Sequence, residues 1–165
     1  MPVPSLLVRP VQPHEHEAVA ELTVSVYREE GLASDGYVPA LRDVASRVAT
    51  ATVLVAVRDE QVIGAVTVAT RHGPWAEQAA PGEAVIRMLA VASEGRGRGV
   101  GEALTRAAVE AARGDGCTLV RLSTQDESTA AHRLYRRLGF VRTPSFDWSP
   151  EPGVELRGWA LPLEP

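Results

Sequence analysis

The stretch Arg96-Gly97-Arg98-Gly99-Val100-Gly101 lies between an apolar run that ends at Val91 and an alanine-rich helical pattern. Because glycine has no Cβ, alternating glycines let the backbone turn tightly, adopt positive φ and come close to a ligand. The helix that follows adds the free amides and positive dipole of its N-terminus, which favour a phosphate group. The stretch therefore predicts a strand, a phosphate-binding turn and a helix.

Two common phosphate-binding patterns do not fit this stretch. The nucleoside-triphosphate loop ends in Gly-Lys-Ser or Gly-Lys-Thr, and this chain contains no lysine. The dinucleotide fingerprint requires a third glycine three places after the second. Counted from Gly95, Gly97 or Gly99, that place holds Val100, Glu102 or Leu104.

The stretch instead resembles the Arg/Gln-x-x-Gly-x-Gly/Ala signature of the GNAT N-acetyltransferases, whose three defining positions hold Arg96, Gly99 and Gly101. The segment Ile86–Val91 resembles the family's strand before this loop, and Ala130–Phe140 resembles its later helix and the entry to the next strand. The resemblance is clear over residues 83–141 and looser elsewhere.

This resemblance implies an α+β fold: the GNAT acyl-coenzyme A N-acyltransferase fold. Its central sheet is mixed and mostly antiparallel, with a splayed parallel strand pair and helices on both faces. It also implies acetyl-coenzyme A (acetyl-CoA) as co-substrate. The expected pyrophosphate-binding residues are Arg96, Gly97, Arg98, Gly99, Val100 and Gly101, and the expected pantetheine-binding backbone is that of Leu89, Ala90 and Val91. Ser128 stands where many relatives have a cofactor-binding asparagine, so it either contacts the cofactor or caps its helix.

Acetyl transfer from a thioester to an amine requires a deprotonated amine and a proton for the departing thiolate. Tyr135 falls where the family's usual general acid stands, and an ordinary tyrosine pKa of about 10 keeps it protonated at neutral pH. The alternative role is that of a half-buried core tyrosine. Relatives often place a carboxylate base at the position of Val85. Glu83, two residues earlier on the same strand face, is our candidate base, or else a solvated strand-end carboxylate.

Periodicity and turn residues predict the remaining elements. The proline-rich segment between the last two strands is expected to be a loop. The expected strands are 6–9, 52–57, 61–68, 83–91, 119–123, 140–141 and 154–161, and the expected helices are 13–31, 38–48, 101–113 and 128–138. A helix joins strand 83–91 to strand 119–123, so these two can run parallel.

Length and composition indicate a single domain over residues 1–165, with 45% apolar and 23% charged residues. No run approaches the roughly 20 apolar residues of a membrane span, and the N-terminus does not resemble a secretory signal, so we expect a cytoplasmic protein without a membrane partner. The net charge of −4 argues against nucleic acid. Cys117 is expected to be buried. No metal is expected, because neither Cys117 nor the histidines show ligand spacing.

The sequence therefore predicts an enzyme that transfers acetyl from acetyl-CoA to a primary amine by direct transfer in a ternary complex. The alternatives are a non-catalytic CoA-binding sensor or interaction module and, less favoured by charge, a nucleic-acid binder. The acceptor is a small-molecule or peptide amine, and the sequence leaves its identity, the acyl group and a homodimer open. The acceptor side is expected to be rimmed by Glu29, Glu30, Asp35, Trp75 and Phe146–Trp148.

Overall fold

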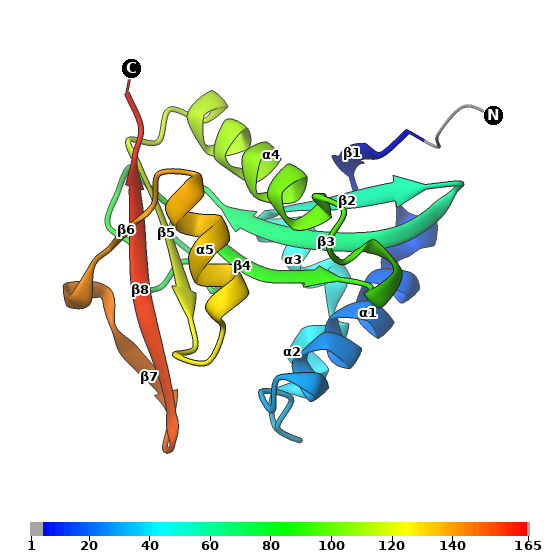
Figure 1. The fold of residues 1–165 in the computed structure, drawn as a ribbon, viewed down its shortest axis with the longest axis horizontal. Helices are drawn as coiled ribbons and strands as arrows, with labels where there is room; N and C mark the ends of the chain where they lie inside the picture. The colour runs from blue at the N-terminus through cyan, green and yellow to red at the C-terminus, as the bar shows by residue number, and fades with distance from the viewer. Residues whose placement is uncertain (1–4, 165) are drawn as a thin grey trace.

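The computed structural model describes residues 5–164. Its eight strands have the order β1-β2-β3-β4-β5-β8-β6, and β7 pairs with β8 (Figure 1). The strands are β1 (Leu7–Pro10), β2 (Thr52–Arg58), β3 (Gln61–Ala69), β4 (Glu83–Val91), β5 (Leu119–Thr124), β6 (Val141–Arg142), β7 (Trp148–Glu151) and β8 (Val154–Pro162). The helices are α1 (His16–Glu29), α2 (Val38–Arg42), α3 (Val44–Thr50), α4 (Val100–Gly114) and α5 (Thr129–Arg137), with short 3-10 turns η1 (Pro13–Glu15), η2 (Ser93–Gly95) and η3 (Pro144–Phe146).

The strands β4 and β5 form the one parallel pair among the described strands, and they stay together only briefly. Their pairing runs from Glu83 opposite Leu119 to Val85 opposite Arg121. Beyond this point β4 remains paired with β3, and β5 remains paired with β8. Figure 1 shows the two strands diverging. The edge of β4 that faces β5 therefore has no strand partner from Ile86 onward, and the expected splayed pair in a mixed sheet is confirmed.

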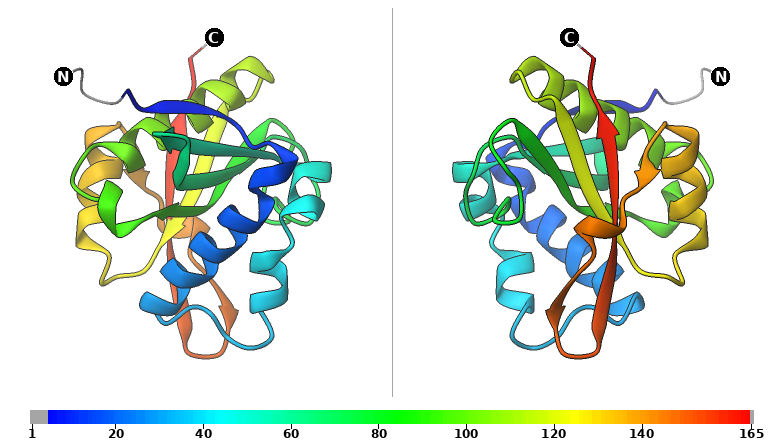
Figure 2. Two further views of the ribbon diagram at one scale, coloured as in Figure 1. Left: turned by 90° about the vertical axis from the view of Figure 1, so that its right-hand side faces the viewer. Right: turned by 90° about the vertical axis from the view of Figure 1, so that its left-hand side faces the viewer.

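Helices cover both faces of the sheet, as expected: α4 and α5 lie on one face and α1, α2 and α3 on the other (Figures 1 and 2). Successive residues of β2 point to opposite faces. Leu54 joins the hydrophobic cluster beneath α4, whereas Val53 and Val55 join the cluster beneath α1 and α3. Because both faces are buried, β2 is a continuous apolar run without polar alternation.

Gly64 lets α4 approach the sheet closely. A Cβ at this position of β3 would lie 2.8 Å from Leu104 Cδ1 and 2.9 Å from Val100 Cγ1. Both side chains are almost fully buried, so neither has room to move aside. The missing side chain at Gly64 of β3 therefore fixes the position of the start of α4 and of the glycine loop that precedes it.

Two expectations about the secondary structure are wrong. The expected helix 38–48 is two helices, because Asp43 adopts φ −86 and ψ 70 between them. Its carboxylate accepts a hydrogen bond from Ser46 N at 3.2 Å and caps α3. The expected loop before β8 contains the strand β7, which pairs with β8. The presence of Pro150 favoured a loop in the prediction, although proline is tolerated on an edge strand.

The other expected helices and strands are confirmed with small shifts of their ends, and Cys117 is buried at 7% exposure. Over residues 5–164, no helix combines the length and apolar character that crossing a membrane requires.

Candidate active site

The loop between β4 and α4 presents a run of backbone amides without acceptors. The first amide of the helix that finds a backbone acceptor is Ala103 N, which donates to Gly99 O at 3.0 Å. Among residues 5–164, no amide from Gly97 to Glu102 donates a hydrogen bond. These donors lie at the positive end of the α4 dipole, an arrangement that suits an anion with several oxygens.

The three glycines of this loop are needed for different reasons. Gly97 and Gly99 adopt φ of 74 and 78, where a side chain is strained. Gly101 does not have positive φ, so the expected need for glycine's conformational freedom is wrong at this position. A Cβ at Gly101 would instead lie 3.7 Å from Leu134 Cδ2 and 3.8 Å from Val91 Cγ2, so it would occupy the gap between α5 and β4.

The two loop arginines have different environments. Arg96 forms a 2.7 Å ion pair with Glu29 at the end of α1, and its Nε donates to Val91 O at 3.3 Å. Arg98 is exposed and forms no ion pair with residues 5–164. The Arg96 guanidinium therefore connects the glycine loop to the C-terminal end of α1.

A β-bulge lies in β4 directly before the residues predicted to bind pantetheine. Arg87 pairs with Thr67 and Ala90 pairs with Ala65, so two residues of β4 stand opposite one residue of β3. Met88 has φ 55, which is unusual for a side chain of this size. A bulge bends its strand and redirects the peptide groups. The backbone of Leu89–Val91 follows this bend along the edge of β4 that has no strand partner.

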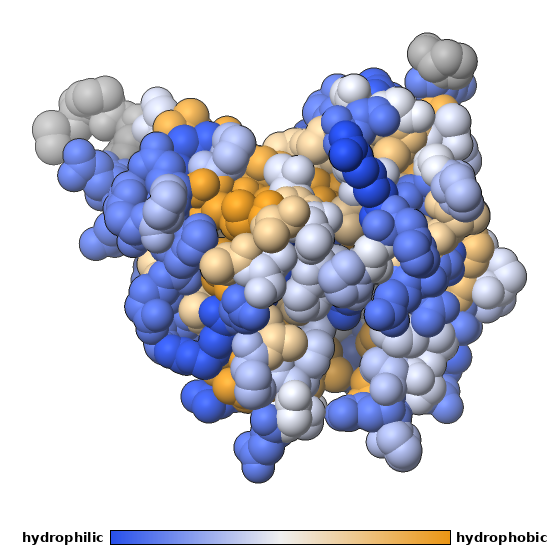
Figure 3. Space-filling model, turned by 180° about the vertical axis from the view of Figure 1, so that it is seen from behind, coloured by the Kyte–Doolittle hydropathy of each residue, from blue (hydrophilic) through white to orange (hydrophobic). Residues whose placement is uncertain are grey.

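A cavity of about 690 Å³ opens between the diverging strands. Its walls come from the α1–α2 segment, the β3–β4 loop, β4, β5, α5 and the β7–β8 hairpin. In Figure 3 the lower edge of the molecule has a notch between two projections, and apolar side chains are visible inside it. The two projections correspond to the α2 region and the β7–β8 hairpin in Figure 1. Of the predicted catalytic and cofactor-binding residues, Leu89, Ser128 and Tyr135 line this cavity. Of the predicted acceptor rim, Glu30, Trp75, Phe146 and Trp148 line it, whereas Glu29, Asp35 and Asp147 do not.

Tyr135 lies on the cavity wall in a largely apolar setting. The residue is 6% exposed, and its ring meets the Phe140 ring edge-on at 5.6 Å. Its hydroxyl forms no hydrogen bond with the described residues. Burial raises the pKa of Tyr135, and the negative charge of Glu30 raises it further. The hydroxyl is therefore protonated at neutral pH and has a proton to donate into the cavity.

The carboxylates of Glu83 and Glu30 lie in different places relative to the cavity. Glu83 accepts a hydrogen bond from Ala80 N at 2.9 Å and forms a 3.3 Å ion pair with Arg121, and it does not line the cavity. Glu30 does line the cavity. Its side chain stays partly exposed, and partial desolvation raises its pKa, an effect that Arg96 opposes. Arg121 itself lines the cavity wall, where its guanidinium stacks 3.5 Å from the centre of the Phe146 ring.

Ser128 occupies the N-cap position of α5, but its side chain makes no capping hydrogen bond. Its hydroxyl is therefore available to a ligand in the cavity that it lines.

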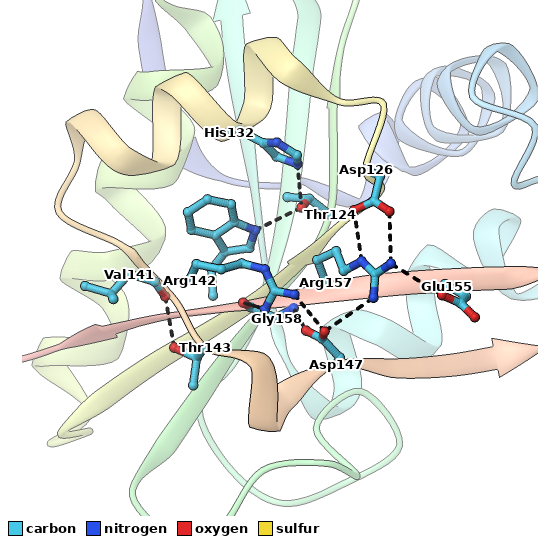
Figure 4. Close-up of polar contacts among 11 residues, drawn as sticks. Thr124, Asp126, His132, Val141, Arg142, Thr143, Asp147, Glu155, Arg157 and Gly158 are labelled. Carbon is cyan, nitrogen blue, oxygen red and sulfur yellow. Dashed lines mark hydrogen bonds and ion pairs between the residues drawn. The ribbon is translucent and has the colours of Figure 1, made fainter.

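A polar network holds the β7–β8 wall of the cavity in place (Figure 4). The Asp147 carboxylate accepts hydrogen bonds from Arg142 at 2.7 Å and Gly158 N at 2.8 Å, and Arg157 approaches at 3.5 Å. These contacts lower the pKa of Asp147, Arg142 first among them. A Cβ on Gly158 would lie 2.7 Å from the Phe146 carbonyl carbon. The Asp147 carboxylate is thus engaged by Arg142, Gly158 and Arg157, and these contacts hold the wall next to Phe146 in place.

His132 belongs to the same side of the molecule and connects α5 to the sheet. Its Nε2 lies 3.0 Å from Thr124 Oγ1, as Figure 4 shows, and 2.9 Å from Gln125 O. Trp159 Nε1 donates to the same threonine at 2.9 Å. The ring also packs against Trp159 at 5.4 Å. These contacts define a structural role. Among residues 5–164, no three His, Cys, Asp or Glu side chains are grouped to hold a metal ion.

Arg87 is a cavity residue that was not predicted from the sequence, although its strand was. Arg87 lines the cavity, and its Nη2 donates to Tyr37 Oη at 3.0 Å. The available signal was a charged residue within an otherwise apolar run.

A splayed strand pair, an uncovered strand edge and a glycine loop at a helix start together define an acyl-coenzyme A N-acyltransferase fold. The model of the acetyltransferase (GNAT) family matches residues 16–140, and the chain belongs to this family.

Individual relatives agree with this assignment. The chain is 40% identical over 92 residues to a mycothiol acetyltransferase of Cellulomonas flavigena, a match that covers 54% of this chain and 26% of that protein. The chain therefore spans about a quarter of that relative's length. A GNAT-family acetyltransferase from Staphylococcus aureus superposes with a TM-score of 0.77 at 15% identity, covering 97% of this chain and 100% of its own. PaiA N-acetyltransferase from Thermoplasma acidophilum, solved with coenzyme A, has a TM-score of 0.74 at 14% identity, with coverage of 96% and 99%. These two structures establish the shared fold.

Proposed function

We propose that this protein transfers an acetyl group from acetyl-CoA to a primary amine by direct transfer in a ternary complex. The observation that supports this most strongly is the run of amides without acceptors from Gly97 to Glu102, next to the unpartnered edge of β4. Membership of the acetyltransferase family supports the same reaction. The acceptor is a small-molecule or peptide amine, and a mycothiol acetyltransferase is among the relatives.

The cofactor would be held by main-chain groups more than by side chains. The loop Arg96–Gly101 binds the pyrophosphate through its amides, with Arg98 free to add charge and Arg96 able to exchange Glu29 for a phosphate oxygen. The backbone of Leu89, Ala90 and Val91 pairs with the pantetheine arm as another strand would. The Ser128 hydroxyl, which is not used for capping, supplies one more hydrogen bond.

The reaction requires two proton movements at the amine and one at sulfur. A base takes one proton from the ammonium, and the neutral nitrogen then forms a bond to the thioester carbonyl carbon. As the carbon–sulfur bond breaks, the nitrogen releases its second proton to solvent. The departing thiolate takes a proton from the Tyr135 hydroxyl, and the tyrosinate is then reprotonated from solvent. The products are the acetamide and free CoA thiol.

The identity of the base stays a prediction with two candidates. Glu83 was chosen from the sequence, but its carboxylate is engaged by Arg121 and Ala80 N outside the cavity lining. Glu30 lines the cavity and acts electrostatically on Tyr135. The pH profiles of kcat/KM for Glu30→Gln and Glu83→Gln decide between them. In the variant that lacks the base, kcat/KM no longer falls at acidic pH through protonation of that carboxylate.

Tyr135→Phe tests the enzyme against the alternative of a non-catalytic CoA-binding module. The substitution removes a hydroxyl without a protein partner, so the fold and the Kd for acetyl-CoA, measured by titration calorimetry, should be unchanged. The rate of thiol release should fall by about 10²–10⁴-fold, the usual contribution of a general acid. A wild-type protein that binds acetyl-CoA but acetylates no amine favours the non-catalytic module. A folded protein without affinity for acetyl-CoA refutes both.

A further inference from the structure

One corner of the cavity holds a guanidinium without a counter-charge. Arg87 lines the cavity from β4 and is half-buried, yet it forms no ion pair with residues 5–164. Its Nη2 donates to Tyr37 Oη at 3.0 Å, and its guanidinium carbon lies 5.3 Å from the centre of the Trp75 ring. Stacking on an indole orients a guanidinium but does not neutralise it.

A second guanidinium behind this corner adds to the positive charge. Arg47 is only 1% exposed and also forms no ion pair with the described residues. Its Nη1 donates to two backbone carbonyls, whereas its Nε is buried without a partner. It lies 5.9 Å from the same indole, and its pKa is lowered by burial. Buried cations are normally paired with a carboxylate, so this corner lacks one negative charge.

The other charges of the cavity lie elsewhere along its wall. Glu30, Glu77 and Glu151 line it, all three are exposed, and none forms an ion pair with a described residue. The remaining arginine of the wall, Arg121, is already paired with Glu83. A cavity with one unpaired cation in a half-buried corner and carboxylates nearer solvent complements a zwitterion better than a dianion such as a phosphate.

We propose that the acceptor is an amino acid or similar amino carboxylate whose carboxylate binds Arg87 and whose ammonium faces Glu30. This inference rests on the proposed acetyltransferase function and specifies its substrate class. The Tyr37 hydroxyl accepts the bond from Arg87 and keeps its own proton to donate to the second carboxylate oxygen.

The position of Arg87 limits the spacing of the two groups of the acceptor. Arg87 directly precedes the bulge at Met88, where the backbone predicted to hold the pantetheine begins. The amine must reach that point, so it lies only a few bonds from the carboxylate, as in an α-amino acid. Glu30 and Arg87 both line the cavity together with Tyr27. The apolar part of the acceptor would face Leu32, Trp75, Trp148 and Leu156.

The test compares apolar amino acids with their carboxamides, for example L-phenylalanine with L-phenylalaninamide, in the thiol-release assay. The carboxamide has the more readily deprotonated amine, so without a carboxylate site it would be the better acceptor. We expect the opposite order, with kcat/KM higher for the amino acid by about 10- to 100-fold, the effect of a charge-assisted hydrogen bond. Binding of N-acetyl-L-phenylalanine and its carboxamide to the protein–CoA complex, measured by calorimetry, gives a second readout without turnover.

Substitution of Arg87 connects this preference to one side chain. In Arg87→Gln the preference should disappear, mainly through a higher KM for the amino acid, while the Kd for acetyl-CoA is unchanged. Arg87→Lys keeps the charge and should keep part of the preference. Arg106→Gln, an exposed arginine of α4 outside the cavity, is the matched control and should behave as wild type.

Three results would overturn the inference: carboxamides that equal or exceed the amino acids, an undiminished preference in Arg87→Gln, or a CoA complex that binds no N-acetyl amino acid. In each case the proposed acetyltransferase function survives if acetyl-CoA binds and another amine is acetylated. A folded protein that does not bind acetyl-CoA refutes the function and this inference together.

Discussion

Replacing Gly99 and Gly101 separately by alanine tests whether the loop works through its backbone. Gly99 has φ 78, and nothing lies within 4 Å of a Cβ built there. The cost of Gly99→Ala is therefore backbone strain alone, about 1–2 kcal/mol for a left-handed residue other than glycine. Part of that cost is offset because alanine has less freedom in the unfolded chain. We expect a net loss of about 1 kcal/mol in the free energy of unfolding.

Gly101→Ala should have the opposite effect on stability. Gly101 lies in the first turn of α4 without positive φ, and the new Cβ would make only ordinary contacts at 3.7 and 3.8 Å. Alanine is favoured over glycine in a helix by about 0.5–1 kcal/mol. The same methyl group, however, enters the gap between Leu134 and Val91, next to the strand edge proposed for pantetheine.

Urea denaturation and titration calorimetry with acetyl-CoA separate these effects. Gly99→Ala should be less stable and bind acetyl-CoA roughly tenfold more weakly, because each misdirected amide loses a hydrogen bond to a charged group. Gly101→Ala should be more stable than wild type and also bind more weakly. If both variants bind acetyl-CoA as wild type does, the loop does not hold the cofactor through its amides. If Gly99→Ala is as stable as wild type, the left-handed conformation is not required.

Three further predictions concern packing and charge. Gly64→Ala should lower the free energy of unfolding by about 1–3 kcal/mol and weaken acetyl-CoA binding, because its Cβ would meet two buried side chains of α4; wild-type stability in urea would contradict this. Glu29→Gln should release Arg96 and tighten acetyl-CoA binding by up to about fivefold, since both partners of this pair are half-exposed; calorimetry showing weaker binding would disprove the exchange. The pKa of Glu15 is lowered by its hydrogen bond to Arg9, so this pair stabilises the fold above about pH 4 and less as the pH falls further. Urea denaturation should therefore show a steeper acid loss in wild type than in Glu15→Gln, and parallel curves would contradict it.

Several functional features were predictable because they depend on near neighbours in the sequence. Positive φ at Gly97 and Gly99, the start of α4 and the N-cap position of Ser128 follow from local propensity. The parallel pairing of β4 with β5 follows from the helix that joins them. Tyr135 was singled out by the family resemblance, because it stands where the family's usual general acid stands, and it lies on the cavity wall.

Other features depended on which distant side chains meet. Glu83 was a reasonable candidate base on strand alternation, yet its pairing with Arg121 joins residues 38 positions apart. The contact of Arg96 with Glu29 spans 67 positions. Pro150 concealed β7 because the tolerance of an edge strand for proline depends on which strand lies beside it.

The amino-acid sequence alone determined the family resemblance, most of the order of elements and the positive φ of Gly97 and Gly99, because apolar periodicity and glycine conformation act over a few neighbouring residues. Only the tertiary structure decided which charges of the cavity are neutralised. It pairs Glu83 with Arg121, and within residues 5–164 it gives Arg87, beside Trp75, no carboxylate partner. The physical reason is that the field at a buried group is the sum over everything packed around it, and those groups come from strands, loops and helices that meet only when the chain has folded.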